Sequence, residues 1–242
     1  MKMKMLLISS FLFIGGQTIV SAESRSETTA TIKVLENDPA TVIAKYIKAV
    51  GGAEKVASIK NASMTGEADF QGQKILIKTI SDSENSRLMQ STSVGGNVVQ
   101  KTLLVDGKAK IIMMGQTQEV PEETAALLRP QTHVFPEQNY AEMGYEMAYI
   151  GTEDIDGEET HKLEITAPNG MKTAEYYSVE SGLKVRTSSE ATGDISYSDY
   201  QEVDGILFPM MLTITNAMLP MPMEAKIVSV KFNTELSDTD FQ

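Results

Sequence analysis

DGEETHKLEITAPNGMKTAEYYSVESGLKVRTSSEATGDISYSDYQEVDG, residues 156–205, carries the clearest structural pattern in this chain of 242 residues. Its glycines fall 13, 12, 11 and 12 residues apart, each beside Asp, Asn, Ser or Thr: Gly157, Gly170, Gly182, Gly193 and Gly205. Such pairs accept the positive φ angles of tight turns. The interval matches one strand plus one turn, so the segment predicts an antiparallel meander.

The strands of this meander are predicted to have one apolar face and one solvated face. Apolar and polar residues alternate through residues 162–167, 183–186 and 228–232. Alternate residues of a strand point to opposite faces of the sheet. The pattern therefore places Lys184 on the solvated face and Val228 on the apolar face.

An earlier set of strands is indicated between residues 61 and 114. The periodicity there is close to two, and Asp, Gly and Asn punctuate the predicted strands Lys74–Ile80, Arg87–Val94, Val98–Val105 and Ala109–Met114. Two short helices, Pro121–Leu128 and Pro136–Gly144, are expected to interrupt the sheet without starting a new domain.

A helix is predicted to precede the strands. Asp38 is a suitable N-cap, and Pro39 fits the first helical position because its missing N–H would be unpaired there anyway. One apolar face follows at helical spacing: Val42, Ile43, Tyr46, Ile47 and Val50. Gly51-Gly52 ends the helix, and a helical turn at Ala53–Ile59 completes a hairpin that we expect to lie against the sheet.

The N-terminus resembles an export signal. Lys2 and Lys4 precede the apolar run Met5–Ile14, and Val20-Ser21-Ala22 is a small-residue cleavage site. We therefore expect a signal peptide at residues 1–22, a flexible linker at 23–37, and one domain at 38–242. The chain has no cysteine, so it lacks the anchor residue of a lipoprotein, and we expect a soluble periplasmic protein.

Charge argues against a nucleic-acid partner. Residues 1–22 contain two lysines and no acid, so the net charge of -12 becomes -14 once they are removed. Phosphate recognition needs clustered Lys and Arg, whereas acids outnumber basic residues here. No apolar stretch after the signal is long enough to cross a membrane.

The sequence offers no catalytic motif. It contains no G-x-S-x-G elbow, P-loop or Rossmann fingerprint, and its two histidines, His133 and His161, are not part of an HExxH pattern. Structural roles suit these histidines better than metal ligation. The acid pairs Glu153-Asp154 and Glu158-Glu159 flank a predicted turn and are expected to be solvated. We therefore expect a protein that is not an enzyme and uses no cofactor or metal.

Methionines cluster at Met113-Met114, Met210-Met211 and in the segment Met218–Met223, MLPMPM. Prolines at 220 and 222 indicate a loop or sheet edge, where apolar side chains are unusual. Methionine suits surfaces that accommodate variable apolar ligands, but it also fills gaps in cores. Both interpretations of the Met218–Met223 segment, a ligand surface and a cover for the core, stay open.

Three stretches carry a family resemblance: YIKAVGG at 46–52, YYSVESGLKV at 176–185, and YSDYQEVDGILFP at 197–209. Together they resemble envelope proteins of the lipoprotein-sorting (LolA/LolB-like) superfamily, particularly a branch also found fused behind pitrilysin-type zinc peptidase domains. The resemblance extends from about Thr41 to Phe241. It implies a mainly β (α+β) fold: a curved, half-open antiparallel β-barrel with helices covering its concave face and a hydrophobic cavity between them.

That fold would bind a lipid, a lipoprotein acyl chain or another hydrophobic molecule without catalysis, in the manner of a carrier. On this hypothesis the first helix is a lid, and the cavity and its mouth are formed by Ile43, Tyr46, Ile47, Met113, Met210, Met218 and Met221. The alternative is a module that docks an envelope protein through the Met218–Met223 segment. The chain has no lipid-anchor cysteine like that of the outer-membrane receptor members of the superfamily.

Overall fold

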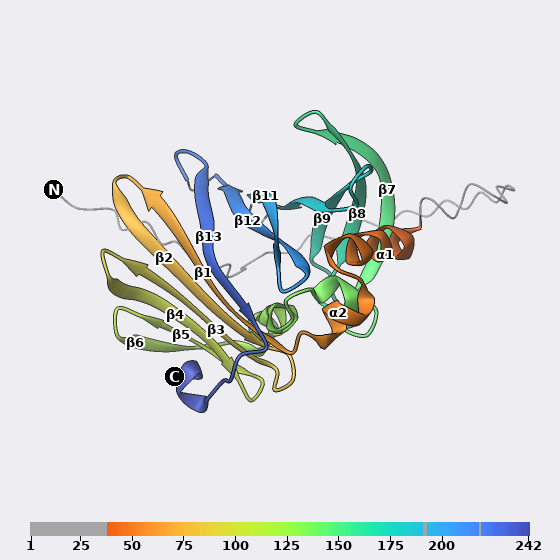
Figure 1. Ribbon diagram of the computed structural model, residues 1–242. Helices are drawn as coiled ribbons and strands as arrows, with labels where there is room; N and C mark the ends of the chain where they lie inside the picture. The colour runs from red at the N-terminus through yellow and green to blue at the C-terminus, as the bar shows by residue number, and fades with distance from the viewer. Residues whose placement is uncertain (1–37, 191–192, 218) are drawn as a thin grey trace, which may run out of the picture.

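The computed structural model describes residues 38–190, 193–217 and 219–242. The predicted signal peptide, the predicted linker and Met218 lie outside these residues. The described chain is mainly β, with a few short helices (Figure 1).

The element order is two helices, six strands, a helical segment, seven strands and a final helical turn. The elements are α1 (Pro39–Val50), α2 (Ala53–Ser58), β1 (Asn61–Phe70), β2 (Gln73–Asp82), β3 (Arg87–Val94), β4 (Asn97–Val105), β5 (Lys108–Met113), β6 (Gln116–Val120), α3 (Glu122–Ala125), the 3-10 helices η1 (Ala126–Thr132) and η2 (Pro136–Asn139), β7 (Glu146–Ile155), β8 (Glu158–Thr166), β9 (Lys172–Ser178), β10 (Lys184–Ser189), β11 (Gly193–Val203), β12 (Ile206–Thr215), β13 (Met223–Phe232) and η3 (Asp238–Phe241).

All the described strands form one antiparallel sheet in the order β6-β5-β4-β3-β2-β1-β13-β12-β11-β10-β9-β8-β7. The last strand, β13, pairs with β1 and so joins the two meanders. β6 and β7 are the two edges and do not pair with each other, so the curved sheet is half-open (Figure 1). The predicted fold class is confirmed.

Turn chemistry explains why the hairpins form where the sequence predicts them. At Asp156-Gly157 and Asp204-Gly205 both residues have positive φ, 57° and 90° in the first turn and 53° and 78° in the second. Two successive positive φ angles define the type I′ turn, whose twist matches that of the flanking strands. The short loops therefore fix the strand register.

Helix α1 forms as predicted. The Asp38 carboxylate accepts a hydrogen bond from the Thr41 backbone N–H at 3.2 Å, and the Gly51 N–H caps the other end by donating to Ile47 O. All five residues of the predicted apolar stripe are buried. The helix therefore belongs to the core, where it packs against β7, β12 and η2.

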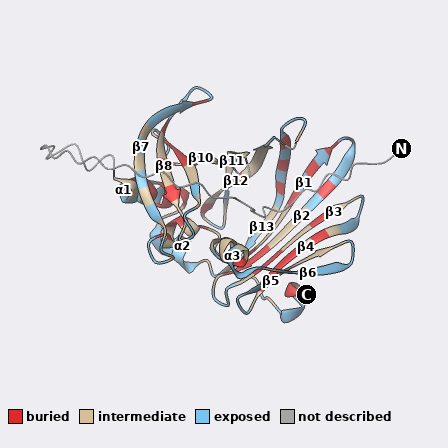
Figure 2. Cartoon of the chain, turned by 180° about the vertical axis from the view of Figure 1, so that it is seen from behind, coloured by how far each residue is buried: buried red, intermediate tan, exposed pale blue. Residues whose placement is uncertain are grey.

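Both groups of helices lie on the same face of the sheet, which we call the concave face (Figures 1 and 2). On β12, Ile206 packs in the cluster that contains α1, and Ile214 lies eight residues further along the same face. On β2, the Ser81 hydroxyl donates to Gln131 O in η1, and Ile75 lies six residues away on that face. The two faces are the same because Ile75 and Ile214 meet in one cluster.

Two predictions of strand faces are wrong. Lys184, expected on the solvated face, is 6% exposed, because the β9–β10 register shifts between Lys184 and Arg186 and two carboxylates lie inside to pair with it. Val228, expected on the apolar face, is 46% exposed, because the β1–β13 register shifts between Thr65 and Gly66 and leaves Val228 without a paired residue.

The helices of the central segment and the C-terminus also differ from what the sequence predicts. The expected helix Pro121–Leu128 is a short α3 that continues as 3-10 helix through Thr132, and only Pro136–Asn139 of the second is helical. The acidic C-terminus forms η3. Its Phe241 is buried against Ile80, Met89 and Leu103, with the Arg87 guanidinium 4.3 Å from the ring centre.

Candidate functional site

An apolar cluster on the concave face is built from strands and one loop residue. Its buried members come from β1, β2 and β13, half-buried residues of β2, β3 and β12 pack against it, and Leu219 of the β12–β13 loop joins them. We call this set the concave cluster: Ala68, Phe70, Ile75, Met223 and Ala225, with Ile77, Val94, Leu212, Ile214 and Leu219. No described helix contributes a residue to it, whereas one neighbouring cluster contains residues of α1 and α2 and the other contains residues of α3 and η1.

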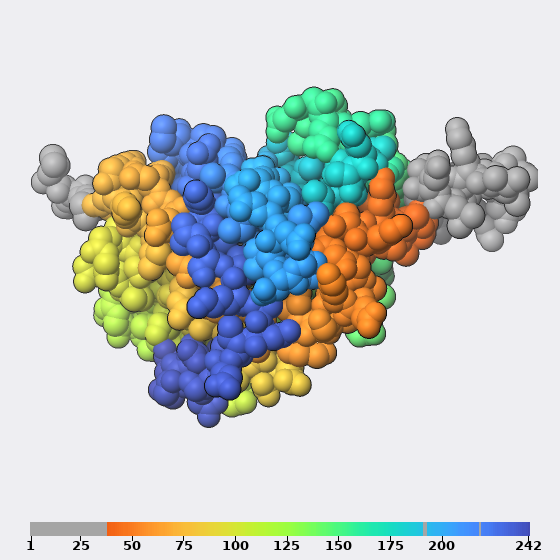
Figure 3. Space-filling model, in the orientation of Figure 1, coloured from red at the N-terminus to blue at the C-terminus, as the bar shows by residue number. Residues whose placement is uncertain are grey.

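The three residues predicted on α1 point inward but are packed. Ile43, Tyr46 and Ile47 are each 7% exposed or less and belong to the cluster with Leu163 and Tyr177. The Tyr46 ring lies 5.3 Å from that of Tyr177, centre to centre. α1 therefore packs onto the sheet at β7 and β12, and Figure 3 shows it beside β12 at the surface.

The predicted methionines are distributed along the concave side. Met113 on β5 and Met210 on β12 are half-buried, and their strands are separated by five others in the sheet. Strand alternation puts Met210 on the face of Phe208 and Leu212, and Met113 on the face of Ala109. Met221 is 60% exposed in the β12–β13 loop, close in sequence to Leu219 of the concave cluster. Met218 is outside the described residues.

A buried charge network lies beneath α1. The Lys184 ammonium contacts Glu137 at 2.5 Å and Glu175 at 2.8 Å, and all three side chains are at most 8% exposed. Tyr140 and Tyr177 both donate to Glu175, at 2.8 and 2.5 Å. The network fastens η2 to β9 and β10.

Burial shifts the pKa values in this network. Desolvation raises the pKa of Glu137 even though Lys184 lowers it, and the second Glu137 oxygen has no hydrogen-bond partner in the described part of the chain. Burial, with the neighbouring Glu175 and Glu137, also raises the pKa of Tyr140 and Tyr177. The tyrosines therefore remain hydrogen-bond donors to the carboxylates at neutral pH.

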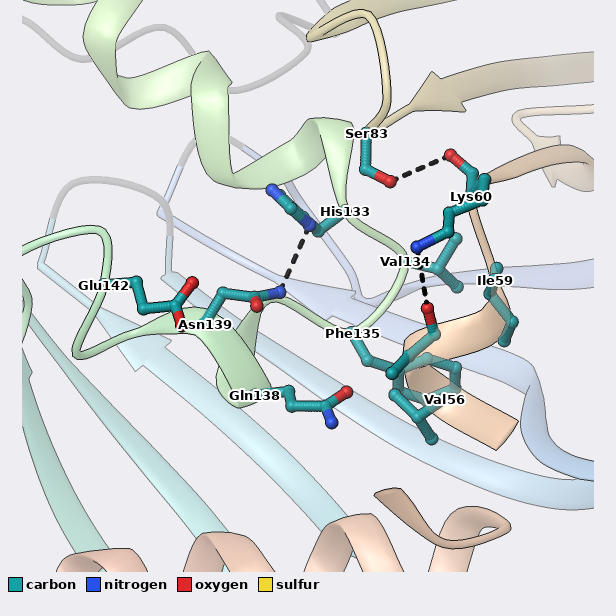
Figure 4. Close-up of a pocket in the computed structure, with 11 residues that line it drawn as sticks. Val56, Ile59, Lys60, Ser83, His133, Val134, Phe135, Gln138, Asn139 and Glu142 are labelled. Atoms are coloured by element: carbon teal, nitrogen blue, oxygen red, sulfur yellow. Dashed lines mark hydrogen bonds between the residues drawn. The ribbon is translucent and has the colours of Figure 1, made fainter. Parts of the chain in front are cut away.

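A separate pocket of about 310 Å³ opens at the base of the molecule (Figure 4). Its apolar floor is formed by Val56, Ile59, Val134 and Phe135, and its polar rim by Lys60, Ser83, His133, Gln138, Asn139 and Glu142. The walls come from α2, the start of β1, the β2–β3 turn and the η1–η2 region. None of these residues belongs to the concave cluster.

Backbone contacts fix the rim of this pocket. Both the N–H and the hydroxyl of Ser83 donate to Lys60 O at 2.9 Å, and the Lys60 N–H donates to the Asn233 side chain at 2.7 Å. The Gln138 side chain donates to Ala53 O at 3.2 Å. Four segments that are distant in sequence are thus held together by direct hydrogen bonds.

His133 is the polar centre of the pocket. The Asn139 amide nitrogen lies 3.2 Å from His133 Nδ1, and because an amide NH₂ can only donate, Nδ1 accepts and Nε2 carries the hydrogen. Burial lowers the pKa of His133, while Glu142 acts in the opposite direction. The ring is therefore neutral near pH 7 and can donate from Nε2.

Sequence reasoning missed both polar sites. Glu137, Glu175 and Lys184 come from η2, β9 and β10, and no spacing in the sequence links them. The buried position of Lys184 depends on the register shift in β10. The pocket residues likewise share no motif, since η1 and η2 bring His133 and Asn139 to the base of β1 and β2.

Two further searches bear on function. No group of three or more His, Asp or Glu side chains in the described ranges is placed to hold a metal ion. Among the described helices, none is long and apolar enough to cross a membrane.

Two solved structures share the fold at TM-scores above 0.5. A DUF1329 family protein from Desulfovibrio piger ATCC 29098 matches with a TM-score of 0.57 and 13% identity, over 85% of this chain and 98% of that chain. A provisionally named outer membrane lipoprotein-sorting protein domain from Vibrio parahaemolyticus matches with a TM-score of 0.51 and 11% identity, over 83% and 97%.

A LolA superfamily protein from Nitrosomonas europaea is similar at a TM-score of 0.49 and 15% identity, over 75% of this chain and 88% of that chain. No protein-family model matches the chain. No curated protein matches it either. The likeness to the Vibrio parahaemolyticus domain agrees with the fold that the lipoprotein-sorting resemblance implied, and the branch fused to pitrilysin-type peptidases stays a prediction.

Proposed function

We propose that this protein binds a lipid, an acyl chain or another hydrophobic molecule on the concave face, as a carrier-like protein of the periplasm that catalyses no reaction. The observation that supports this most directly is the concave cluster, an apolar surface made by strands and the β12–β13 loop between two helix-covered ends. The fold shared with a lipoprotein-sorting domain agrees with it.

In this proposal the residues at the two ends have different tasks. α1, with Ile43, Tyr46 and Ile47, covers one end of the site and limits how far a ligand can extend. Met113 and Met210 offer adaptable contacts along the concave face, and Met221 of the β12–β13 loop contributes to the mouth. Met218, predicted to line the mouth with it, is outside the described residues. Flexible thioethers suit a ligand whose chain length varies.

The energetics favour an acyl chain. Each buried CH₂ contributes about 0.8 kcal/mol, so a chain with roughly a dozen of them gains about 10 kcal/mol before the loss from ordering it. Apolar contact of this kind requires no reactive group.

A displacement titration with a fluorescent fatty acid tests the proposal. The purified protein should bind the probe saturably and release it to unlabelled fatty acid. Met210→Glu places a charge on the concave face and should weaken binding at least about tenfold, since a carboxylate loses hydration beside an acyl chain. The matched control is Leu76→Glu. Leu76 is 41% exposed and follows Ile75 on β2, so it lies on the opposite face.

Absence of probe binding would contradict the proposal, as would equal weakening by both substitutions. Urea unfolding of both variants establishes that the comparison is made between folded proteins.

Tight packing beneath α1 favours a second function, in which the chain is a protein-interaction module related to the domain fused behind pitrilysin-type peptidases. Val50 is fully buried there, and the exposed Met221 is available to contact a partner protein. Pull-down from envelope extract, compared with mass spectrometry of lipid retained through native purification, separates the two. A stoichiometric protein partner with no retained lipid supports the module, and retained lipid supports the carrier.

A further inference from the structure

The pocket at the base of the molecule is not used by the proposed lipid site, and its charges have a definite arrangement. Figure 4 shows Lys60 and Glu142 on opposite sides of the hollow, with His133 between them. The lining thus offers one cation, one anion and a neutral donor around an apolar floor. A ligand that matches it must carry both charges.

The Lys60 side of the pocket has hydrogen-bond donors that no described residue uses. Lys60 Nζ donates to Ala57 O at 3.1 Å, which uses one of its three N–H groups and holds the ammonium at the pocket edge. His133 Nε2–H is a second donor, since Nδ1 is occupied by Asn139. An anionic group beside Lys60 would receive charge-assisted hydrogen bonds from its two remaining N–H groups.

The Glu142 side has only acceptors. Glu142 forms no hydrogen bond or ion pair with any described residue, and its charge acts on His133. The Asn139 amide gives its nitrogen to His133, so its oxygen is free to accept, and Gln138 likewise donates through its nitrogen to Ala53 O. Figure 4 shows the Asn139 oxygen on the side of the Glu142 carboxylate, so this side can accept hydrogen bonds from an ammonium group.

We propose that this pocket binds a small zwitterion that carries an ammonium and an anionic phosphate or carboxylate, with the anion toward Lys60, the ammonium toward Glu142 and the ligand passing His133. A volume of about 310 Å³ accommodates a molecule of this size. The apolar floor, Val134 and Phe135 included, supports the carbon linker between the charges. The inference does not depend on the lipid site.

The two histidines of the chain provide an internal comparison for testing it. His133 lies in the pocket, and His161 lies on β8 beside Tyr149. Proton NMR of the imidazole signals, assigned with His133→Asn, follows titration with ethanolamine phosphate. The His133 signal should shift saturably while the His161 signal stays in place. Ethanolamine alone and inorganic phosphate alone should bind at least about tenfold more weakly, because each satisfies one side only.

Lys60→Gln and Glu142→Gln test the two sides separately. Each should raise the dissociation constant for ethanolamine phosphate at least about fivefold, since partly exposed charged hydrogen bonds make contributions of this size. Lys108→Gln and Glu119→Gln are matched controls, because both residues are exposed on β5 and β6, and they should bind as the unmodified protein does. No His133 shift up to about 10 mM probe, or unchanged affinity in both pocket variants, overturns the proposal.

The zwitterion has two sources that the same variants distinguish. Flotation with phosphatidylethanolamine vesicles that is reduced by Glu142→Gln identifies a lipid headgroup. Binding of soluble ethanolamine phosphate without such flotation identifies a free small molecule. Either result supports the pocket, and neither depends on fatty-acid binding at the concave cluster, so failure of one proposal leaves the other measurable.

Discussion

At the scale of single residues, the most demanding feature is Lys184 with its two carboxylates. Two acids and one base leave the group with a net negative charge, which is costly away from water. Tyr140 and Tyr177 offset part of this cost by donating to Glu175. One oxygen of Glu137 is left without a partner in the described chain. The network is thus stable only while all its members are present.

Lys184→Met should therefore be strongly destabilising. It removes the only cation of the network and leaves Glu137 and Glu175 buried together, so we expect the free energy of unfolding to fall by about 3–5 kcal/mol. Lys172→Met is the matched control, because the Lys172–Glu164 pair on neighbouring strands is exposed and should contribute under about 1 kcal/mol. Urea unfolding measures both. Similar midpoints for the two variants would show that the buried network contributes no more than a surface pair.

The raised pKa of Glu137 gives a stability change with a definite sign. Because the folded state binds this proton more tightly than the unfolded state, its stabilising effect is full below the unfolded pKa of about 4.3 and is lost as pH rises through the folded pKa. Relative to Glu137→Gln, the unmodified protein should lose stability as the pH rises above the unfolded pKa. Unfolding curves above that pKa check this, with Glu119→Gln expected to run parallel to the unmodified protein. If the unmodified protein instead became more stable than Glu137→Gln as the pH rises, the folded pKa of Glu137 would be lowered, contrary to this account.

At the scale of elements, α1 shows what sequence can predict. Asp38, Pro39, the apolar stripe and Gly51-Gly52 are local signals, and the helix begins and ends where they place it. The hairpins with Asp-Gly turns follow for the same reason. Register shifts, in contrast, have no local signal in the sequence. The shifts beside Lys184 and Val228 depend on pairing with distant residues, so period-two alternation assigned both residues to the wrong face.

Gly51 tests the contact between α1 and the sheet. Gly51 and Gly52 both have positive φ, 150° and 92°, so alanine strains the backbone at either position. Only at Gly51 would a Cβ meet other atoms, Ile206 Cδ1 at 2.8 Å and Gly205 O at 3.0 Å, whereas nothing lies within 4 Å at Gly52. Gly51→Ala should cost about 1–3 kcal/mol more than Gly52→Ala, measured by thermal or urea unfolding. Equal losses would mean that α1 can move away from the β11–β12 turn at little cost.

At the scale of the whole molecule, the chain forms a half-open sheet because its last strand returns to its first. β13 pairs with β1, which places both meanders in one curved wall and leaves β6 and β7 as free edges. Most turn positions were readable from local sequence, but β1 and β6 were not named as strands. The closing pair joins residues more than 150 positions apart and has no local signal. The same limit explains why neither the concave cluster nor the pocket around His133 could be predicted, because each brings together residues that are distant in sequence.

The central claim, that the concave face receives an apolar chain, can be tested by photo-crosslinking with a diazirine fatty acid followed by peptide mass spectrometry. The account predicts adducts on inward residues of β1, β2, β12 and β13, including Met210 and Leu212, that disappear when unlabelled fatty acid is in excess. Adducts confined to outward residues such as Leu76 and Val228, or insensitive to that competition, would contradict it.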